Sequence, residues 1–237
     1  MTSEQADKLL RAACEFQGKS LAARESCRKQ FRQIEQNEDN IFRILVDGQL
    51  GLMAEKMTSK VDSTTPAISY QIGISASFIR THFLVAEFIL NGDLVEAIVL
   101  IRKQLESLAR LHELDSKPLQ KLTGKVPNIQ NALKAGTRQM YEELSEVAHF
   151  STPRVTTLLH VAEQGELIGP SLLPAHTELG KACIDMEHFV VVYFIAWMIE
   201  KLPEWYPGYD NSNDRELLGD TIVLALKSGV LHQPEKD

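Results

Sequence analysis

The pattern of apolar positions predicts a protein built almost entirely of helices. Apolar residues recur at intervals of three and four along most of the chain, which is the period of one face of an α-helix. Proline, glycine and clusters of polar residues break this pattern. It predicts helices over about 4–36, 41–57, 67–91, 93–114, 128–135, 137–150, 176–202 and 213–227. We therefore expect an all-α, multi-helix bundle.

Short signals at three places indicate where particular helices end or begin. Asn91-Gly92 follows a long apolar segment and is a typical helix stop, because glycine adopts the left-handed conformation at little cost. Asp93 is then a candidate N-cap for the next helix. Gly229 lies where the last helix should end.

One segment has the character of β-structure. Residues 154–169 contain two runs rich in β-branched residues, which flank Glu163-Gln164-Gly165. Such a pattern is typical of a β-hairpin. The sequence thus predicts one small hairpin, near residues 154–169, inserted in a helical protein.

No repeat, low-complexity tract or shift in composition divides the chain. We expect residues 1–237 to form a single helical domain, in which residues 1–58 are a semi-independent N-terminal helical hairpin.

Composition and charge narrow the classes of function. The net charge of −7 argues against a broad electrostatic grip on nucleic acid or on an anionic membrane. The longest apolar run, residues 189–199, is about half of the roughly 20 residues that span a bilayer. Three cysteines without CxxC spacing indicate free thiols, and the polar N-terminus does not resemble a secretory signal. These features predict a cytoplasmic protein that does not enter a membrane.

Two helical segments carry polar residues four positions apart, which places them side by side on one face. The first segment has Arg102, Glu106 and Arg110 in register, and the second has the set Tyr141, Ser145 and His149. We expect Arg102, Glu106, Tyr141, Ser145 and His149 to form one partly buried hydrogen-bond network between facing helices.

That cluster has two interpretations. Histidine titrates near neutrality and tyrosine or arginine can support a developing anion, so the five residues are the candidate catalytic residues of the chain. A satisfied structural network is the alternative, and it is the interpretation we favour. The Ser145–His149 pair lacks a GxSxG elbow and an oxyanion-hole loop, which argues against a serine hydrolase.

The two stripes also support a family comparison. The pattern R-x3-E within an apolar helix, followed some 30 residues later by Y-x2-L-S-x3-H, resembles an uncharacterised group of bacterial helical-bundle proteins. The matching positions are Arg102, Glu106, Tyr141, Leu144, Ser145 and His149. The resemblance covers about residues 70–200. It implies a helical fold and candidate polar residues, but it implies no reaction.

A more distant resemblance is to HEPN-type helical domains, many of which are RNases that use an arginine and a histidine separated by four to six residues. Arg154 and His160 have five residues between them. The resemblance implies a metal-independent RNase of a defence system, and with it RNA as a partner. In this chain, however, the pair falls in the predicted hairpin, whereas the family's motif lies on a helix.

A third interpretation is a di-metal site. Four-helix carboxylate proteins use Glu-x-x-His on two helices and one further Glu on each of two others. The chain offers an approximate version of this set in Glu87, Glu106, Glu146, His149, Asp185 and His188. The second motif has Asp in place of Glu, and Glu146 falls among solvated glutamates.

On balance the sequence predicts a non-catalytic interaction or regulatory module that uses no cofactor. The expected partner is another protein or a second copy of the chain, and the long charged N-terminal helix is one candidate contact surface. The RNase and the di-metal protein remain the alternatives.

Overall fold

The computed structural model describes residues 1–61, 63–133, 137–159, 161–164 and 167–231. Within them it confirms the all-α prediction. The elements are α1 (Ser3–Ile34), α2 (Asn37–Met57), α3 (Pro66–Asn91), α4 (Leu94–Ser116), α5 (Leu119–Leu122), α6 (Ile129–Ala132), α7 (Thr137–Ala148), the 3-10 helix η1 (Pro153–Leu158), β1 (Val161–Gln164), β2 (Leu167–Pro170), α8 (Leu179–Trp205) and α9 (Ser212–Ser228).

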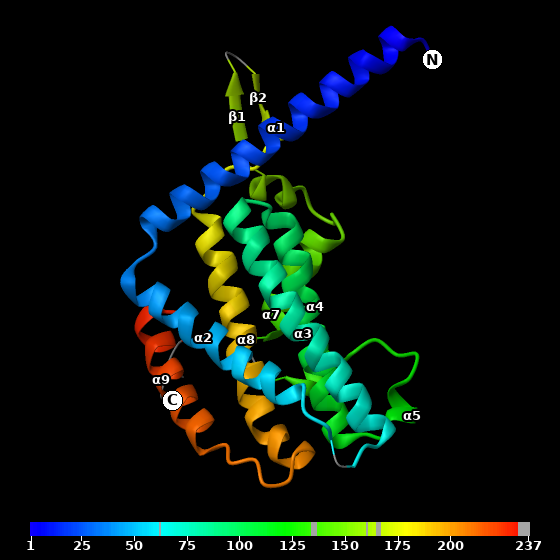
Figure 1. Cartoon of the computed structure of the whole chain (residues 1–237), viewed down its shortest axis with the longest axis vertical. Coiled ribbons are helices and arrows are strands. Elements are labelled where there is room, and N and C mark those ends of the chain that lie inside the picture. The colour runs from blue at the N-terminus through cyan, green and yellow to red at the C-terminus, as the bar shows by residue number, and fades with distance from the viewer. Residues whose placement is uncertain (62, 134–136, 160, 165–166, 232–237) are drawn as a thin grey trace.

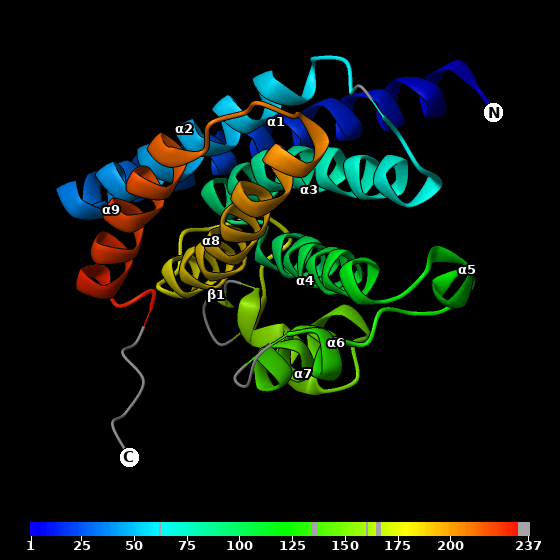
Figure 2. The same ribbon diagram turned by 90° about the horizontal axis from the view of Figure 1, so that it is seen from below.

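Helices α4 and α8 form the centre of the bundle. They pack against each other, and α3 packs against both. Helices α2 and α9 cover α8 from one side, while α6 and α7 cover α4 from the opposite side (Figures 1 and 2). This arrangement explains why α8 has apolar residues on nearly all its faces, since a helix surrounded by others has little use for a polar side.

One hydrophobic core runs through the bundle and draws on its aromatic side chains. Phe78 of α3 stacks on Phe194 of α8, with ring centroids 3.9 Å apart. Trp197 meets Trp205 edge to face at 5.7 Å. Buried residues from α1, α2, α3, α4, α7, α8 and α9 belong to the same cluster. Large aromatic surfaces of this kind dominate the apolar area that a core removes from water.

Two of the expected helix stops are confirmed. Gly92 and Gly229 both have φ of 80°, the left-handed region in which glycine lacks the strain of other residues. Gly92 also lies at a close approach. A Cβ there would come within 2.8 Å of the carbonyl oxygen of Ala175 and 3.1 Å of Cys27 Sγ.

Asp93 occupies the expected N-cap position of α4, but its side chain makes no capping hydrogen bond to the helix. Instead, the carboxylate accepts from Arg24 of α1, at 2.8 Å from Nε and 3.1 Å from the second nitrogen. Nearby, Arg28 Nε donates to Asn91 Oδ1 at 2.7 Å and Arg28 also pairs with Glu87. The α3–α4 corner therefore anchors α1 to the bundle.

The β-hairpin is confirmed, but its position is not that predicted. Strands β1 and β2 pair antiparallel with Val161 opposite Pro170, while residues 153–158 form a 3-10 helix instead of a strand. Pro153 begins that helix, where its fixed φ is favourable. Thr156 Oγ1 donates to the Pro153 carbonyl at 2.8 Å, and Val155 is buried. Local hydrogen bonds and burial thus outweigh the β-propensity of this run.

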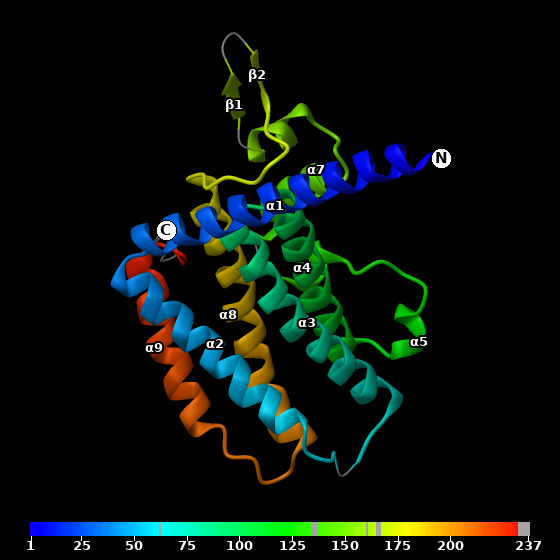
Figure 3. The same ribbon diagram turned by 45° about the horizontal axis from the view of Figure 1, so that its top comes forward.

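Helix α1 extends well beyond the bundle. Its C-terminal part packs on α3, whereas its N-terminal half projects past the other helices (Figures 1 and 3). Helix α2 packs on α8 and α9 instead. The semi-independence of residues 1–58 remains a prediction, and the structure adds that its two helices pack on different parts of the bundle.

In the part of the chain that the structure describes, two helices are long and apolar enough to cross a membrane by length and composition. They are α3 and α8, whose most apolar windows are 39% and 61% buried within the bundle. Core helices share these properties, so the observation is weak evidence for a membrane.

Candidate functional site

The two polar stripes predicted from the sequence meet where α4 packs on α7. Arg102 donates to His149 Nε2 at 2.9 Å and to the Tyr141 hydroxyl at 3.2 Å. That hydroxyl donates to Glu106 Oε1 at 3.0 Å, and Arg102 forms an ion pair with Glu106 at 3.0 Å. The guanidinium also lies 5.2 Å from the centre of the Tyr141 ring. Four of the five predicted residues therefore form one network, which we call the α4–α7 clamp.

Ser145 does not join this network. Its hydroxyl donates to the backbone carbonyl of Tyr141, four residues earlier, at 2.6 Å. Serine in a helix commonly satisfies its hydroxyl in this way. Arg110, in register with Arg102 on α4, is also directed elsewhere. It pairs with Glu113 and donates to the carbonyls of Leu122 and Lys125, so it holds the segment that follows α5.

The hydrogen bonds of the clamp have a defined direction. Arginine carries donors only, so Nε2 of His149 is the acceptor in its bond with Arg102. Burial disfavours the charge of Arg102, but the hydrogen bond from its guanidinium to Tyr141 and the charge of Glu106 outweigh burial and raise its pKa. The lone pair of His149 that a general base would use is occupied by Arg102. This geometry makes the clamp a structural link between two helices, in which the buried Nε of Arg102 has no hydrogen-bond partner among the described residues.

The residues of the di-metal hypothesis do not converge. Glu106 and His149 belong to the clamp, whereas Glu87 pairs with Arg28 and Asp185 pairs with Lys181. The two remaining residues, Glu146 and His188, line separate hollows. Among the described residues, no group of three histidine, cysteine, aspartate or glutamate side chains is placed to hold a metal ion. The predicted set is thus not assembled.

The arginine–histidine pair of the RNase hypothesis lies outside what the structure describes. His160 is not among the described residues, and only the backbone of Arg154 is described, within η1. The hypothesis stays a prediction.

The structure also contains a buried ionic cluster that the sequence did not reveal. His82 of α3 lies between two carboxylates, with Nε2 2.7 Å from Asp47 Oδ1 of α2 and Nδ1 hydrogen-bonded to Glu187 of α8. The histidine and Glu187 are almost fully buried, at 1% and 3% side-chain exposure. Burial opposes the charge of His82, but the charge of Glu187 and the hydrogen bonds to both carboxylates raise its pKa to about 10. His82 is accordingly a buried cation.

This cluster continues towards the molecular surface through His188. The Nε2 atom of His188 lies 3.8 Å from Glu187 Oε2, and its ring meets Phe42 edge to face at 4.9 Å. Burial lowers the pKa of His188, although the charge of Glu187 acts in the opposite direction. The cluster is thus a row of Asp47, His82, Glu187 and His188. In it His82 is the protonated histidine and His188 the neutral one. No spacing in the sequence indicates it, since its members come from three separate helices.

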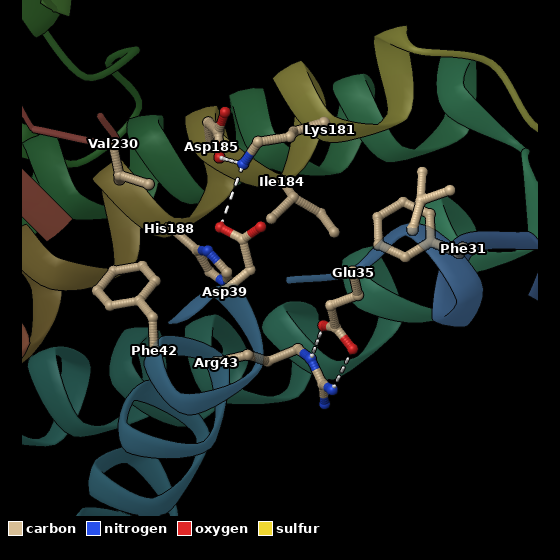
Figure 4. A pocket seen from close by; sticks show the side chains of 11 residues that line it. Phe31, Glu35, Asp39, Phe42, Arg43, Lys181, Ile184, Asp185, His188 and Val230 are labelled. Carbon is tan, nitrogen blue, oxygen red and sulfur yellow. Dashed lines mark hydrogen bonds and ion pairs between the residues drawn. The ribbon is translucent and has the colours of Figure 1, made fainter. Parts of the chain in front are cut away.

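His188 borders a pocket at the junction of α1, α2 and α8 (Figure 4). The apolar part of its lining comes from Phe31, Ile34, Phe42, Ile184 and Val230. The charged side chains around it form ion pairs. Arg43 pairs with Glu35, and Lys181 pairs with both Asp39 and Asp185.

Comparisons with protein-family models, with curated proteins and with solved structures gave no match for this chain.

Proposed function

We propose that this protein is a homodimeric interaction module and that the N-terminal half of α1 is its contact element. The observation that carries the proposal is the exposure of this half. From residue 3 to residue 19 no side chain is buried. Four large apolar side chains in and next to this segment are nonetheless exposed to solvent. Each is at least 50% exposed, and they are Leu9, Leu10, Phe16 and Leu21.

An exposed helix of this kind gains stability when a partner covers its apolar face. Most helical stability in proteins comes from such packing. Residues 3–19 lack such packing within their own chain. An apolar stripe on a helix without tertiary contacts is typical of an interaction surface.

The stripe has a defined direction. Leu9, Ala13 and Phe16 are spaced by four and three residues, and the same steps lead on through Ser20 to the bundle-facing part of α1. That part includes the buried Cys27. The face that packs on the bundle in one half of α1 is thus the face left uncovered in the other half.

Charge supports a second copy as the occupant. Residues 1–21 contain Glu4, Asp7, Glu15, Lys8, Arg11 and Lys19, so this segment is neutral while the whole chain carries −7. We call this neutral N-terminal segment the arm. Two copies that approach through their arms avoid most of the electrostatic repulsion between the acidic remainders of the two chains. A two-fold axis brings the same stripe of both copies together, as in most homodimers, and the small side chain of Ala13 permits a close crossing.

The exposed apolar residues of this segment predict a weak dimer. Burying a half-exposed Leu or Phe contributes about 1 kcal/mol, so Leu9 and Phe16 of the stripe, with the flanking Leu10 and Leu21, contribute roughly 8 kcal/mol per dimer. Association costs at least about 4 kcal/mol. The remaining gain of about 4 kcal/mol corresponds to a dissociation constant of about 1 mM.

Sedimentation velocity over a range of protein concentrations tests the proposal. Wild-type protein should show a concentration-dependent dimer, and the double variant Leu9→Glu, Phe16→Glu should be a monomer with an intact bundle by near-ultraviolet circular dichroism. Ile44→Glu is the matched control, because Ile44 is 57% exposed on α2, away from the stripe. A wild-type chain that shows no dimer at about 1 mM would contradict the proposal.

A cytoplasmic location fits this function and is part of the proposal. Cys14 is exposed on the arm, and both other cysteines are also free thiols. Free exposed thiols persist in a reducing compartment. In this proposal the α4–α7 clamp is structural and holds α7 on the bundle.

A further inference from the structure

The pocket beside His188 is built from elements that are distant in the sequence. The last turn of α1 supplies Phe31 and Ile34, the first turns of α2 supply Phe42, and the start of α8 supplies Ile184 and His188 (Figure 4). It lies apart from the projecting half of α1. An occupant of this pocket is accordingly independent of the proposed dimer.

The pocket combines apolar walls with one unpartnered polar group. His188 is only 5% exposed, yet no hydrogen bond joins its ring to any described residue. Its nearest carboxylate oxygen, on Glu187, is 3.8 Å away, beyond hydrogen-bond distance. The ring nitrogens of His188 are not among the sealed polar atoms that lack a hydrogen bond, so they stay accessible beside the pocket. A ligand in the pocket can therefore bond to the imidazole.

The charges around the pocket disfavour a charged ligand. Lys181 lies 3.3 Å from both Asp39 and Asp185, and Arg43 pairs with Glu35 at 3.0 Å. Both cations are therefore already neutralised, and an anion would meet a surplus of carboxylates. A cation would have to compete with Lys181 for the carboxylate oxygens of Asp39 and Asp185. It would also lose its hydration shell on contact with the apolar walls, which costs free energy.

The size of the pocket limits what it encloses. The cavity measures about 50 Å³ and is partly open to the surface. A buried water needs about 10–15 Å³, so the space takes a group of only a few heavy atoms. A ligand the size of one ring would insert its edge and leave the remainder at the mouth.

From these observations we propose that the pocket binds a small neutral molecule with an apolar ring or branched body and a single hydroxyl or carbonyl group. The apolar body lies against Phe31, Phe42 and Ile184, and the polar group bonds to the ring of His188. A neutral imidazole can donate or accept, so it accommodates either group.

Phenol is the minimal probe of this chemistry, and methyl-resolved NMR of the full chain is the measurement. Phenol should shift the Ile34, Ile184 and Val230 methyl signals saturably, with a dissociation constant of about 1 mM. Toluene has nearly the same shape without the hydroxyl and should bind about 3- to 10-fold more weakly, the range expected for one hydrogen bond. Benzoate and benzylamine should bind more weakly than phenol.

Three variants make the test specific. Ile184→Trp should fill the cavity and abolish the phenol response, while Ile44→Trp, on an exposed face elsewhere, should leave it unchanged. Val230→Phe is a second blocking variant that alters a residue outside any helix, so loss of fold does not confound it. His188→Phe should make phenol and toluene equal.

Several results would overturn the assignment. A response that does not saturate, a response that survives both blocking variants, or equal binding of phenol and toluene to the wild type would each rule it out. Tighter binding of benzoate or benzylamine would contradict the neutral class of ligand. Dimerisation measured on the same samples reports separately on the arm, so the two proposals can fail independently.

Discussion

The buried cluster around His82 should make the stability of this protein fall as the pH rises above neutrality. Unfolding returns His82 to its ordinary pKa of 6.5, whereas in the folded state Glu187 and Asp47 raise it to about 10. Between these two values the folded protein keeps a proton that the unfolded chain has released. The contribution of His82 is therefore complete below pH 6.5 and is lost as the pH rises through about 10.

The magnitude follows from the one-proton difference. Each pH unit within this window lowers the free energy of unfolding by about 1.4 kcal/mol. Between pH 6.5 and pH 8.5 the loss is roughly 3 kcal/mol, a large part of a typical stability of about 5–15 kcal/mol. The upper limit of pH 8.5 avoids the titration of Cys183. Burial raises the pKa of this thiol to about 12, so the free energy of unfolding falls further above pH 9.

Urea unfolding followed by far-ultraviolet circular dichroism at pH 6.5, 7.5 and 8.5 measures this slope. Glu187→Gln removes the nearest negative charge and should flatten it to less than half, while lowering the stability at pH 6.5. Glu25→Gln is the matched control, because Glu25 is an exposed glutamate on α1 and should leave the slope unchanged. A wild-type stability that is constant from pH 6.5 to 8.5 would refute the reasoning, as would an unchanged slope in Glu187→Gln.

Four further outcomes follow from the structure. Burial lowers the pKa of His188, so its folded form resists protonation and the free energy of unfolding should also fall as the pH drops below 6.5, seen in the same urea titrations. Tyr141→Phe removes the hydroxyl that joins Arg102 to Glu106 and should cost about 1 kcal/mol of stability by urea unfolding. Gln104→Met should raise the melting temperature by about 2–4 °C, because the fully buried amide has no partner among the described residues; a lower value would show that the amide is satisfied. Cys14 should react with a thiol reagent at once and Cys183 only on unfolding, since the first is exposed and the second buried.

The sequence predicted the helices well because their signals are local. A run such as residues 67–91 ends where Gly92 permits a left-handed turn, and both the run and the stop can be identified without knowing what surrounds them. The hairpin was harder to place. Val155 and Thr156 have the side chains of a strand, yet Pro153 and the burial of Val155 give a 3-10 helix.

The two ionic clusters differ in how far sequence reasoning reaches them. Arg102 and Glu106 share one helix, and Tyr141 and His149 share another, so four-residue spacing places each pair and only one helix contact remains to be inferred. The other cluster joins His82 to residues 35 and 105 positions away. Such long-range pairing depends on how three helices pack, which no local pattern specifies.

The anchoring of α1 at one end gives the molecule the mechanics of a lever. Arg24 and the close approach at Gly92 fix the fulcrum at the α3–α4 corner. Residues 3–19 extend beyond it, and these 17 residues measure about 26 Å at 1.5 Å per residue. A rotation of about 10° at the fulcrum therefore moves the tip by about 4 Å. Small changes in packing at one corner of the bundle would thus be amplified into a large change in the position of the N-terminal end of α1, and with it of the contact in the proposed dimer.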